Sequence, residues 1–417
     1  MNVSFPPVPE QMDLLRQNAQ EIISEEELER KLDKSLATGK PLRVKQGFDP
    51  TRPDLHIGHA VSIRQLRVFQ ELGHEVIFVI GDYTALIGDP TGRSELRPRL
   101  TESEIAENSQ TYAAQVFQIL DAERTTVEYN SRWLKPLKLE DVLKLTAHYT
   151  VARMIEREDF ANRFREGRPI SLVEFMYPLL QAYDSVALRA DIELGGSDQK
   201  FNLLVARAIQ ERYGQDPQVC MLMPLLRGTD GVQKMSKSYD NYIGLSMPAD
   251  DQYGRTMSIP DELLPEWYQL VSGLERLMLQ EHMLLAETEP YRAKRALAAL
   301  IVERHHGAQA ATEAADRFDL VHREHGVPDD IPSFDITADD AELGAEGGEV
   351  WLPRLLVRAG LAPSTSQAGR LIEQGAVSLD GTRVDDRKAR VPLRGEVLLQ
   401  RGKRHFAKVR FVGQGQD

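Results

Sequence analysis

The chain has 417 residues, of which 41% are hydrophobic and 28% charged, and it contains one cysteine, Cys220. This composition is typical of a globular protein of roughly two to three domains, and a single cysteine excludes a disulfide framework and a cysteine-based zinc site. No run approaches the about 18 apolar residues that cross a membrane, and the N-terminus lacks the basic and apolar stretches of a signal peptide, so we expect a cytoplasmic protein.

Charge is distributed unevenly along the chain. The formal net charge is −13, but residues 351–417 carry 13 Lys and Arg against 6 Asp and Glu, a balance of +7, which leaves −20 for the first 350 residues. A basic segment behind an acidic body favours a polyanionic partner for that segment. The alternative is a solvated basic domain without such a partner.

The predicted elements alternate in the first part of the chain. Residues 1–40 look helical and end at Gly39 and Pro41. Residues 42–48 (LRVKQGF) predict a strand, residues 56–72 predict a helix, and residues 75–82 (EVIFVIGD) predict a buried strand. This order of strand, helix and strand is typical of a parallel α/β unit.

The same pattern recurs farther along. Residues 190–214 predict a short strand, a turn and a helix, and residues 219–226 (VCMLMPLL) predict another buried strand. The polar clusters GFDPT, GDYTALIGDP and GGSDQ each follow a predicted strand. Because ligands bind beyond the carboxyl ends of the strands in open parallel sheets, we expect the three clusters to converge on one crevice.

A histidine pair, His56 and His59, opens the predicted helix of residues 56–72. A metal site is disfavoured because no third ligand is obvious nearby and the spacing is not that of a zinc protease helix. A packed pair without a role remains possible. The third interpretation is phosphate binding, because a helix N-terminus presents free N–H groups and Gly58 lets a flat ring approach the backbone.

Two lysines, Lys234 and Lys237, lie three residues apart in the string DGVQKMSKSYDN. Two ammonium groups on a mobile segment can close on a polyphosphate and stabilise charge that develops there. Alone, the five-residue match is weak. Its combination with His-Ile-Gly-His between a strand and a helix makes chance agreement very unlikely.

Residues 56–59 and 234–238 resemble the two signature motifs of class I aminoacyl-tRNA synthetases. The strings GFDPT, GDYTALIGDPTGR, EFMYPLLQAYDS and GGSDQ resemble the tyrosyl-tRNA synthetase family, and residues 352–381 resemble a small RNA-binding module of a ribosomal protein. The resemblance covers essentially the whole chain. It implies activation of L-tyrosine with ATP, with Mg²⁺ travelling on ATP and no dedicated metal site, transfer of tyrosine to the 3′ end of the cognate tRNA, and a homodimer.

The expected architecture is an α/β fold with four parts. A Rossmann-type parallel-sheet catalytic domain spans residues 1–247, and a helical anticodon-binding domain spans residues 248–327. An acidic linker rich in Pro and Gly follows at residues 328–350, and a small α+β RNA-binding domain occupies residues 351–417.

The resemblance implies roles for residues at the ATP site. Those expected to contact the β- and γ-phosphates as charge builds there are Thr51, His56, Arg93, Lys234 and Lys237. Those expected around the adenosine are Gly58, His59, Gly196 and Asp198. By itself, Asp198 could equally cap the helix that follows it.

A polar stripe, Tyr177, Gln181 and Asp184, has the spacing of one helix face, and Ser171 and Glu174 have the spacing of its capping box. Apolar neighbours suggest that the stripe is buried and needs polar partners, although Tyr177 could simply be a core tyrosine.

The resemblance assigns Tyr177 and Gln181 to the α-amino group of tyrosine, with Asp89 as its charged partner. It assigns Asp184 to the phenolic hydroxyl. The other pocket positions that it implies are Asp49 and Gln199.

One position departs from the family pattern. Many tyrosyl enzymes have a tyrosine four residues before the GFDPT aspartate, where this chain has Lys45. Either another group assists Asp184 or the pocket is built differently.

Two rival functions share many of these features. Tryptophanyl-tRNA synthetase has the same fold and signatures, but the basic tail and the stripe from Tyr177 to Asp184 favour tyrosine. A non-catalytic RNA-binding protein on a synthetase scaffold would need neither the lysine loop nor the histidine pair.

Overall fold

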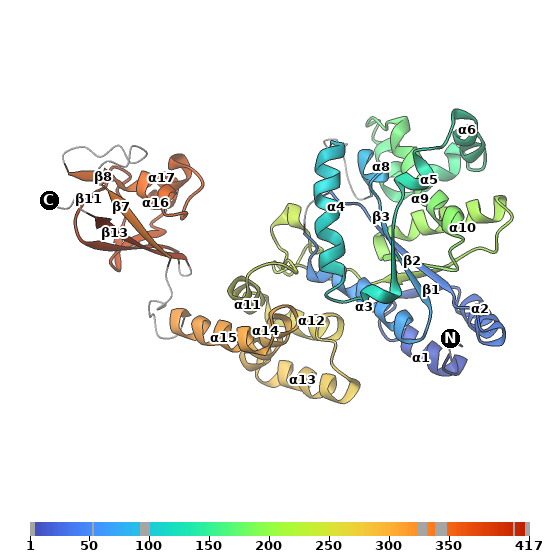
Figure 1. Cartoon of the computed structure of the whole chain (residues 1–417), viewed down its shortest axis with the longest axis horizontal. Coiled ribbons are helices and arrows are strands. Elements are labelled where there is room, and N and C mark those ends of the chain that lie inside the picture. The colour runs from blue at the N-terminus through green and yellow to red at the C-terminus, as the bar shows by residue number, and fades with distance from the viewer. Residues whose placement is uncertain are drawn as a thin grey trace. The chain divides into compact units, whose positions relative to one another are not determined.

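The computed structural model describes residues 5–51, 54–91, 101–322, 332–337, 348–402 and 405–412. The chain forms two compact units, Met1–Ala311 and Thr312–Asp417 (Figure 1). In the described ranges we find no helix with both the length and the apolar character needed to cross a bilayer. The four-part division remains a prediction.

A six-stranded sheet organises the first unit, with the order β1-β6-β5-β2-β3-β4. The predicted alternation is confirmed by β2 (Arg43–Phe48), α3 (Ile57–Glu71), β3 (Glu75–Ile80), β5 (Ile192–Gly196), α10 (Lys200–Arg212) and β6 (Val219–Met223). These strands pair in parallel. Strand β4 (Thr125–Tyr129), which was not predicted, pairs in parallel with β3.

The expectation of helix throughout residues 1–40 is wrong at one point. Helices α1 (Val8–Arg16) and α2 (Glu25–Thr38) flank a short strand, β1 (Glu21–Ile23), which pairs antiparallel with β6. Three residues carry no usable periodicity, so only pairing with the sheet edge reveals this strand.

Helices cover both faces of the sheet (Figure 1). Alternate side chains of β2 face opposite layers. Gln46 donates a hydrogen bond to Ser62 of α3, whereas Lys45 pairs with Glu193 of β5 on the side of α9 (Leu172–Leu188). The other helices of this region are α4 (Glu102–Val116), α5 (Ser131–Leu134), α6 (Leu139–Ala147), α7 (Val151–Met154) and α8 (Glu158–Arg165).

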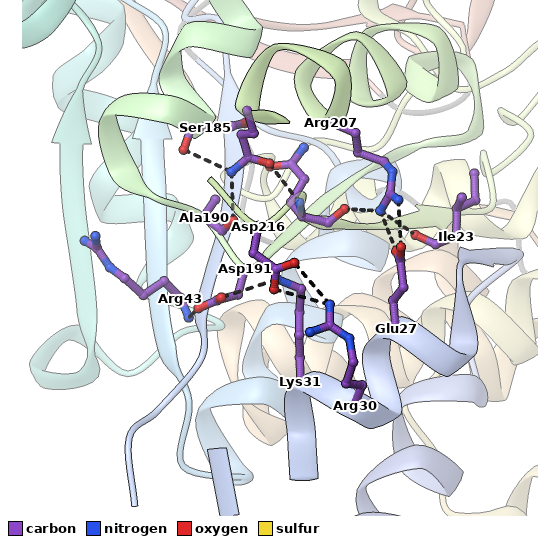
Figure 2. Close-up of polar contacts among 12 residues, drawn as sticks. Ile23, Glu27, Arg30, Lys31, Arg43, Ser185, Ala190, Asp191, Arg207 and Asp216 are labelled. Atoms are coloured by element: carbon purple, nitrogen blue, oxygen red, sulfur yellow. Dashed lines mark hydrogen bonds and ion pairs between the residues drawn. The ribbon is translucent and has the colours of Figure 1, made fainter. Parts of the chain in front are cut away.

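A charged network joins α2 to the sheet (Figure 2). Lys31 is 2% exposed, and its Nζ lies 3.1 Å from Asp216 Oδ2 and 3.6 Å from Asp191 Oδ1. Asp191 Oδ2 accepts a hydrogen bond from the main-chain N–H of Arg43 at 2.9 Å. These contacts hold the beginnings of β2 and β5 side by side, which places the opposite, carboxyl ends of both strands at one edge.

The predicted helical region is confirmed. It consists of α11 (Ala249–Met257), α12 (Leu264–Val271), α13 (Arg276–Thr288), α14 (Pro290–His306) and α15 (Ala308–His322). Elsewhere in the first unit, and once in this region, short 3-10 helices form at Thr84–Leu86, Ala122–Arg124, Ser197–Gln199, Lys237–Tyr239 and Asp261–Leu263. Trp267 of α12 is fully buried and belongs to the same apolar core as β2 and α3.

The second unit has its own apolar core. It begins within α15, and its further helices are α16 (Leu352–Arg358) and α17 (Thr365–Glu373). Its strands are β7 (Ser333–Thr337), β8 (Glu349–Trp351), β9 (Val377–Leu379), β10 (Thr382–Val384), β11 (Arg390–Pro392), β12 (Glu396–Arg401) and β13 (His405–Val412). The sheets have the orders β10-β9-β12-β13-β7 and β11-β8.

Part of the predicted linker is structured. Strand β7 lies within residues 328–350 and pairs in parallel with β13. Phe334 and Ile336 pack against the core of this unit. The apolar residues at alternate positions of SFDIT are a strand signal that the acidic composition of the segment concealed.

Candidate active site

A cavity of about 1020 Å³ lies in the first unit, where the clusters after β2, β3 and β5 meet. The predicted convergence of GFDPT, GDYTALIGDP and GGSDQ is therefore confirmed. The predicted site residues that line the cavity are Asp49, Thr51, His56, Gly58, His59, Asp89, Tyr177, Gln181, Asp184, Gly196, Asp198, Gln199, Lys234 and Lys237. Arg93 lies outside the described residues.

The two histidines stack on each other at the start of α3, with ring centroids 3.7 Å apart. The main-chain N–H of His56 donates to Nδ1 of His59 at 3.2 Å, so Nδ1 is unprotonated. Burial and the nearby lysines lower the pKa of His59 to about 4 and hold that of His56 well below its usual value. Both rings are therefore neutral at physiological pH and can act through hydrogen bonds.

Gly58 has a steric role beside this pair. A Cβ there would lie 3.0 Å from Nδ1 of His56, so glycine lets the imidazole rest against the backbone. Nδ1 of His56 is buried without a hydrogen-bond partner among the described residues. A buried polar atom that lines a cavity is suited to contact a polar ligand.

The two lysines reach the cavity from one loop. Lys234 Nζ lies 2.6 Å from Asp198 Oδ2, and Lys237 Nζ donates to the main-chain oxygen of Asp54 and lies 3.6 Å from its Oδ2. Met235, between them, is 5% exposed and packs in the core. This buried anchor holds the loop so that both ammonium groups face the same cavity.

Asn241 is a loop residue that the sequence did not single out. It is 2% exposed, and its side chain accepts from Ser236 N–H and donates to Asp230 and to the main-chain oxygen of Lys234. These bonds tie the two ends of the lysine loop together. The asparagine four residues after Lys237 carries no signal of its own in a single sequence.

Asp198 does not cap the helix that follows it. The residue at the N-cap of α10 is Gln199, and no side-chain cap bond forms there. The Asp198 carboxylate instead binds Lys234. Gly196 makes room for it, because a Cβ at that position would lie 2.8 Å from Asp198 Oδ1.

A chain of hydrogen bonds runs along one wall of the cavity. Tyr177 donates to Asp49 Oδ2 at 2.9 Å, and Thr84 donates to Asp49 Oδ1 at 2.7 Å. Asn130 then links Thr84 to Asp184 with bonds of 3.0 and 3.3 Å. Tyr177 is thus a cavity residue with a polar partner, and burial raises its pKa well above the usual range.

Asp184 lies at the buried end of this chain and is 4% exposed. Trp133 donates to its Oδ1 at 2.7 Å. Burial raises the pKa of Asp184 to about 6, against the opposing effects of Lys45, Trp133 and Asn130. The carboxylate is therefore mostly ionised at neutral pH and faces the cavity as an acceptor.

Gln181 has a defined orientation. Its Nε2 donates to Glu193 Oε1 at 3.2 Å, whereas its buried Oε1 has no partner among the described residues. Because a carboxylate only accepts hydrogen bonds, Glu193 directs the Gln181 carbonyl elsewhere, and the side chain lines the cavity. Nearby, Gln199 donates to Asp89 at 2.8 Å.

The hydrogen-bond partners of Asp184 were not evident from the sequence. Asn130 directly follows β4, a strand that was not predicted, and Trp133 lies one turn later in α5. With β4 recognised, the rule that polar clusters follow strands would have pointed to Asn130. Glu193 lies in the short strand predicted at the start of residues 190–214, where a single carboxylate carries no local signal.

Matches to known families cover both units. A family model described as tRNA synthetases class I (W and Y) matches residues 37–323, and a model described as S4 domain matches residues 350–398. The tyrosine–tRNA ligase of Moorella thermoacetica is 54% identical over 405 residues, which are 96% of this chain and 96% of that protein. The tyrosine–tRNA ligase of Geobacter metallireducens is 50% identical over 97% of this chain and 99% of that protein.

Solved structures share the fold. The tyrosyl-tRNA synthetase of Archaeoglobus fulgidus, crystallised with L-tyrosine, has a TM-score of 0.59 and 24% identity and covers 74% of this chain and 100% of its own. A truncated mitochondrial tyrosyl-tRNA synthetase of Aspergillus nidulans has a TM-score of 0.62 and 23% identity, with coverages of 76% and 94%. At these identities the likeness shows the fold alone.

Proposed function

Since the chain belongs to the tyrosyl-tRNA synthetases of class I, we propose that its cavity activates L-tyrosine with ATP and that its basic C-terminal unit helps to hold the tRNA. The observation that carries the proposal is the single cavity shared by the histidine pair, both lysines and the stripe from Tyr177 to Asp184. A tyrosine–tRNA ligase works in two steps, in which the tyrosine carboxylate attacks the α-phosphorus of ATP and a terminal ribose hydroxyl of tRNA then attacks the adenylate.

The first step needs positioning and charge stabilisation more than proton transfer. As pyrophosphate leaves, negative charge grows on the β- and γ-phosphates. Lys234 and Lys237 supply positive charge, Thr51 and the neutral ring of His56 supply hydrogen bonds, and His59 is proposed to contact the adenosine. Arg93, which follows the GDPTG turn, is proposed as a further cation.

The ion pair between Lys234 and Asp198 has to separate during this step. Asp198 is proposed to accept hydrogen bonds from the ribose hydroxyls of ATP, beside Gly58 and Gly196, while Lys234 moves to the phosphates. Lys234 is 46% exposed, and pairs of this kind contribute only about 0–1 kcal/mol. ATP can therefore replace the contact at little energetic expense.

The polar stripe is proposed to bind tyrosine at both ends. The unpaired Gln181 Oε1, the Tyr177 hydroxyl and the Asp89 carboxylate suit the α-ammonium group, which only donates hydrogen bonds. Asp184 accepts from the phenolic hydroxyl. Asp49 and Gln199 hold Tyr177 and Asp89 in place through the bonds described above.

Mg²⁺ is proposed to accompany ATP, with phosphate oxygens and water as its ligands. Among the described residues, no group of three His, Cys, Asp or Glu side chains could hold a metal ion. The proposed compartment is the cytoplasm, where a bacterial protein of this family meets ATP and tRNA.

A homodimer is the proposed assembly. Five large apolar side chains between residues 139 and 172 are exposed, namely Leu139, Leu143, Val151, Phe164 and Leu172. Apolar surface of this kind commonly marks an interface. We expect Phe164→Asp to shift the protein from dimer to monomer at micromolar concentration in sedimentation velocity, because it places a charge in an apolar contact.

The matched control for this experiment is Leu277→Asp. Leu277 is also exposed, at 76%, but lies on α13 and outside that stretch. The control should sediment like the wild type. A Phe164→Asp protein that stays dimeric would contradict the assignment of this surface.

The identity of the amino-acid substrate is tested by measuring ATP–pyrophosphate exchange with each amino acid in turn, and then by measuring the charging of tRNA. Exchange driven by tyrosine is expected, and exchange driven by tryptophan is not. The curated relatives are tyrosine ligases, which disfavours both the tryptophanyl enzyme and a non-catalytic RNA-binding protein. Absence of exchange with any amino acid would overturn the proposal.

A further inference from the structure

A buried ion pair lies under the tyrosine end of the cavity and has no role in the mechanism above. Lys45 Nζ and Glu193 Oε1 are 2.9 Å apart, and each side chain is 1% exposed. The two residues are register partners on the adjacent strands β2 and β5. Charges removed this completely from water destabilise the fold unless they are well paired.

Glu193 is saturated with donors. It accepts from Lys45, from Gln181 at 3.2 Å, from Ser185 at 3.2 Å and from Gln218. Gln181 and Ser185 lie on α9, three residues before and one residue after Asp184. The ion pair is thereby attached to the helix segment that carries the proposed phenol acceptor.

Asp184 is surrounded by charged and titratable groups from several elements. Lys45 comes from β2, Glu193 from β5 and Tyr177 from α9 itself, and the neutral donors Trp133 and Asn130 complete the set. Lys45 lowers the pKa of Asp184 more strongly than Glu193 raises it. The pair therefore acts on Asp184 mainly through its ammonium group.

We infer that Lys45, held in place by Glu193, is a positioning residue that keeps Asp184 ionised for the phenol of tyrosine. The inference rests on the proposed tyrosine site and deepens it. It also accounts for Lys45 at a position where many members of the family have a tyrosine, since here the side chain acts on the phenol through the charge of Asp184. Recognition of the phenolic hydroxyl then depends on the charges of three buried side chains, Lys45, Glu193 and Asp184.

This arrangement predicts a particular pH dependence. Asp184, with a pKa of about 6, becomes protonated as the pH falls through that value, so kcat/KM for tyrosine should fall on the same acid limb. The histidines at the ATP site do not interfere, because the pKa of His59 is about 4 and that of His56 is also well below normal. Asp184→Asn should abolish the limb.

The test measures kcat/KM for tyrosine in pyrophosphate exchange from pH 5 to 8 at saturating ATP. Lys45→Met should move the acid limb to higher pH, whereas Glu193→Gln should move it to lower pH. A displacement of about 0.5–1 pH unit corresponds to a change of about three- to tenfold in kcat/KM on the limb. A purely structural role would not move the limb in opposite directions.

The single variants each leave one buried charge without its partner, which destabilises the fold. The double variant Lys45→Met/Glu193→Gln removes both charges together and therefore controls for this effect. The acid limb of the double variant should lie at a higher pH than that of the wild type and at a lower pH than that of Lys45→Met, because Lys45 affects the pKa of Asp184 more strongly than Glu193 does. The matched control is Lys31→Met/Asp216→Asn, which removes another buried lysine and its partner, in the network of Figure 2 outside the cavity lining, and should leave the limb in place.

The outcomes separate the two proposals. This inference would be overturned if the acid limb stayed at the wild-type pH in all three variants of Lys45 and Glu193, or if it moved in the same direction in both single variants. Either result would leave tyrosine activation intact. A wild-type protein without tyrosine-dependent exchange at any pH would overturn the proposed function, and this inference with it.

Discussion

Replacing Lys237 with alanine is expected to slow formation of the adenylate about 10- to 100-fold, with little change in the affinity for tyrosine. The side chain is 10% exposed and reaches the cavity beside Asp54. A hydrogen bond to a charged group contributes about 1.5–3 kcal/mol, and each 1.4 kcal/mol corresponds to about a tenfold change in rate. Because the phosphates gain charge only as pyrophosphate leaves, the loss appears in the transition state.

Lys234→Ala should show a similar defect. Its ammonium group must leave Asp198 to reach the phosphates, so this variant also frees the Asp198 carboxylate for the ribose. We therefore expect slower chemistry with an ATP affinity that is unchanged or slightly higher. Single-turnover kinetics at saturating tyrosine and varied ATP separate the two quantities, because the plateau gives the rate constant and the half-saturating concentration reports the ATP affinity.

Lys200→Ala is the matched control for both lysines. Lys200 follows the GGSDQ cluster, is 46% exposed and pairs with Glu21, and it does not line the cavity. Its removal should leave the single-turnover rate constant unchanged. Wild-type rates in both loop variants would sink the assignment of the lysine loop to the phosphates.

Removal of the C-terminal unit is expected to spare pyrophosphate exchange and to reduce charging of tRNA by at least about tenfold at physiological salt. The structure determines where to cut. A chain that ends at Glu349 would keep β7 but lose its partner β13, exposing an unpaired strand with Phe334 and Ile336. The cut therefore belongs after His322, at the end of α15.

The reason for the expected loss is electrostatic. Contacts between phosphates and Lys or Arg release counterions, so binding weakens as salt rises. Arg354, Arg358, Arg370 and Lys388 are exposed in the C-terminal unit, and the first two lie one helical turn apart on α16. The truncated chain should bind tRNA more weakly and with a shallower dependence on salt.

A full-length variant tests the same point without removing a domain. Arg354→Gln/Arg358→Gln/Arg370→Gln should reduce the slope of log K against log salt by up to about 3, roughly 0.9 for each phosphate contact. Arg410→Gln is the control, since that guanidinium already lies within 3.6 Å of Asp335 and 3.5 Å of Glu396. Equal slopes in the triple variant and the wild type would refute the assignment.

The sequence alone predicted the features that depend on local order. Alternating strands and helices showed the parallel sheet, because each element has a periodicity that its neighbours in the chain reveal. The rule that polar clusters follow strands brought GFDPT and GGSDQ to one cavity, and the family motifs identified the residues that line it. The capping box of Ser171 and Glu174 at the start of α9 was also visible, and the structure has it.

Only the tertiary structure showed contacts between distant segments. Lys45 and Glu193 are 148 positions apart, and they meet because β2 and β5 pair in one particular register. In the sequence, Lys45 was only a departure from the family pattern, and Glu193 was not singled out at all. Burial turns them into a pair, since neither charge can remain in the core without the other.

Contacts between distant segments also explain why strands β1 and β7 and the partners of Asp184 were not predicted. Strands β1 and β7 are short, and each exists because a sheet edge satisfies its backbone groups. Asn130 and Trp133 reach Asp184 from a strand and helix that no local pattern revealed. Local patterns determine the elements that have a clear periodicity, whereas the short edge strands, the ionisation of Asp184, the orientation of Gln181 and the position of Lys234 depend on which distant groups become neighbours in the folded chain.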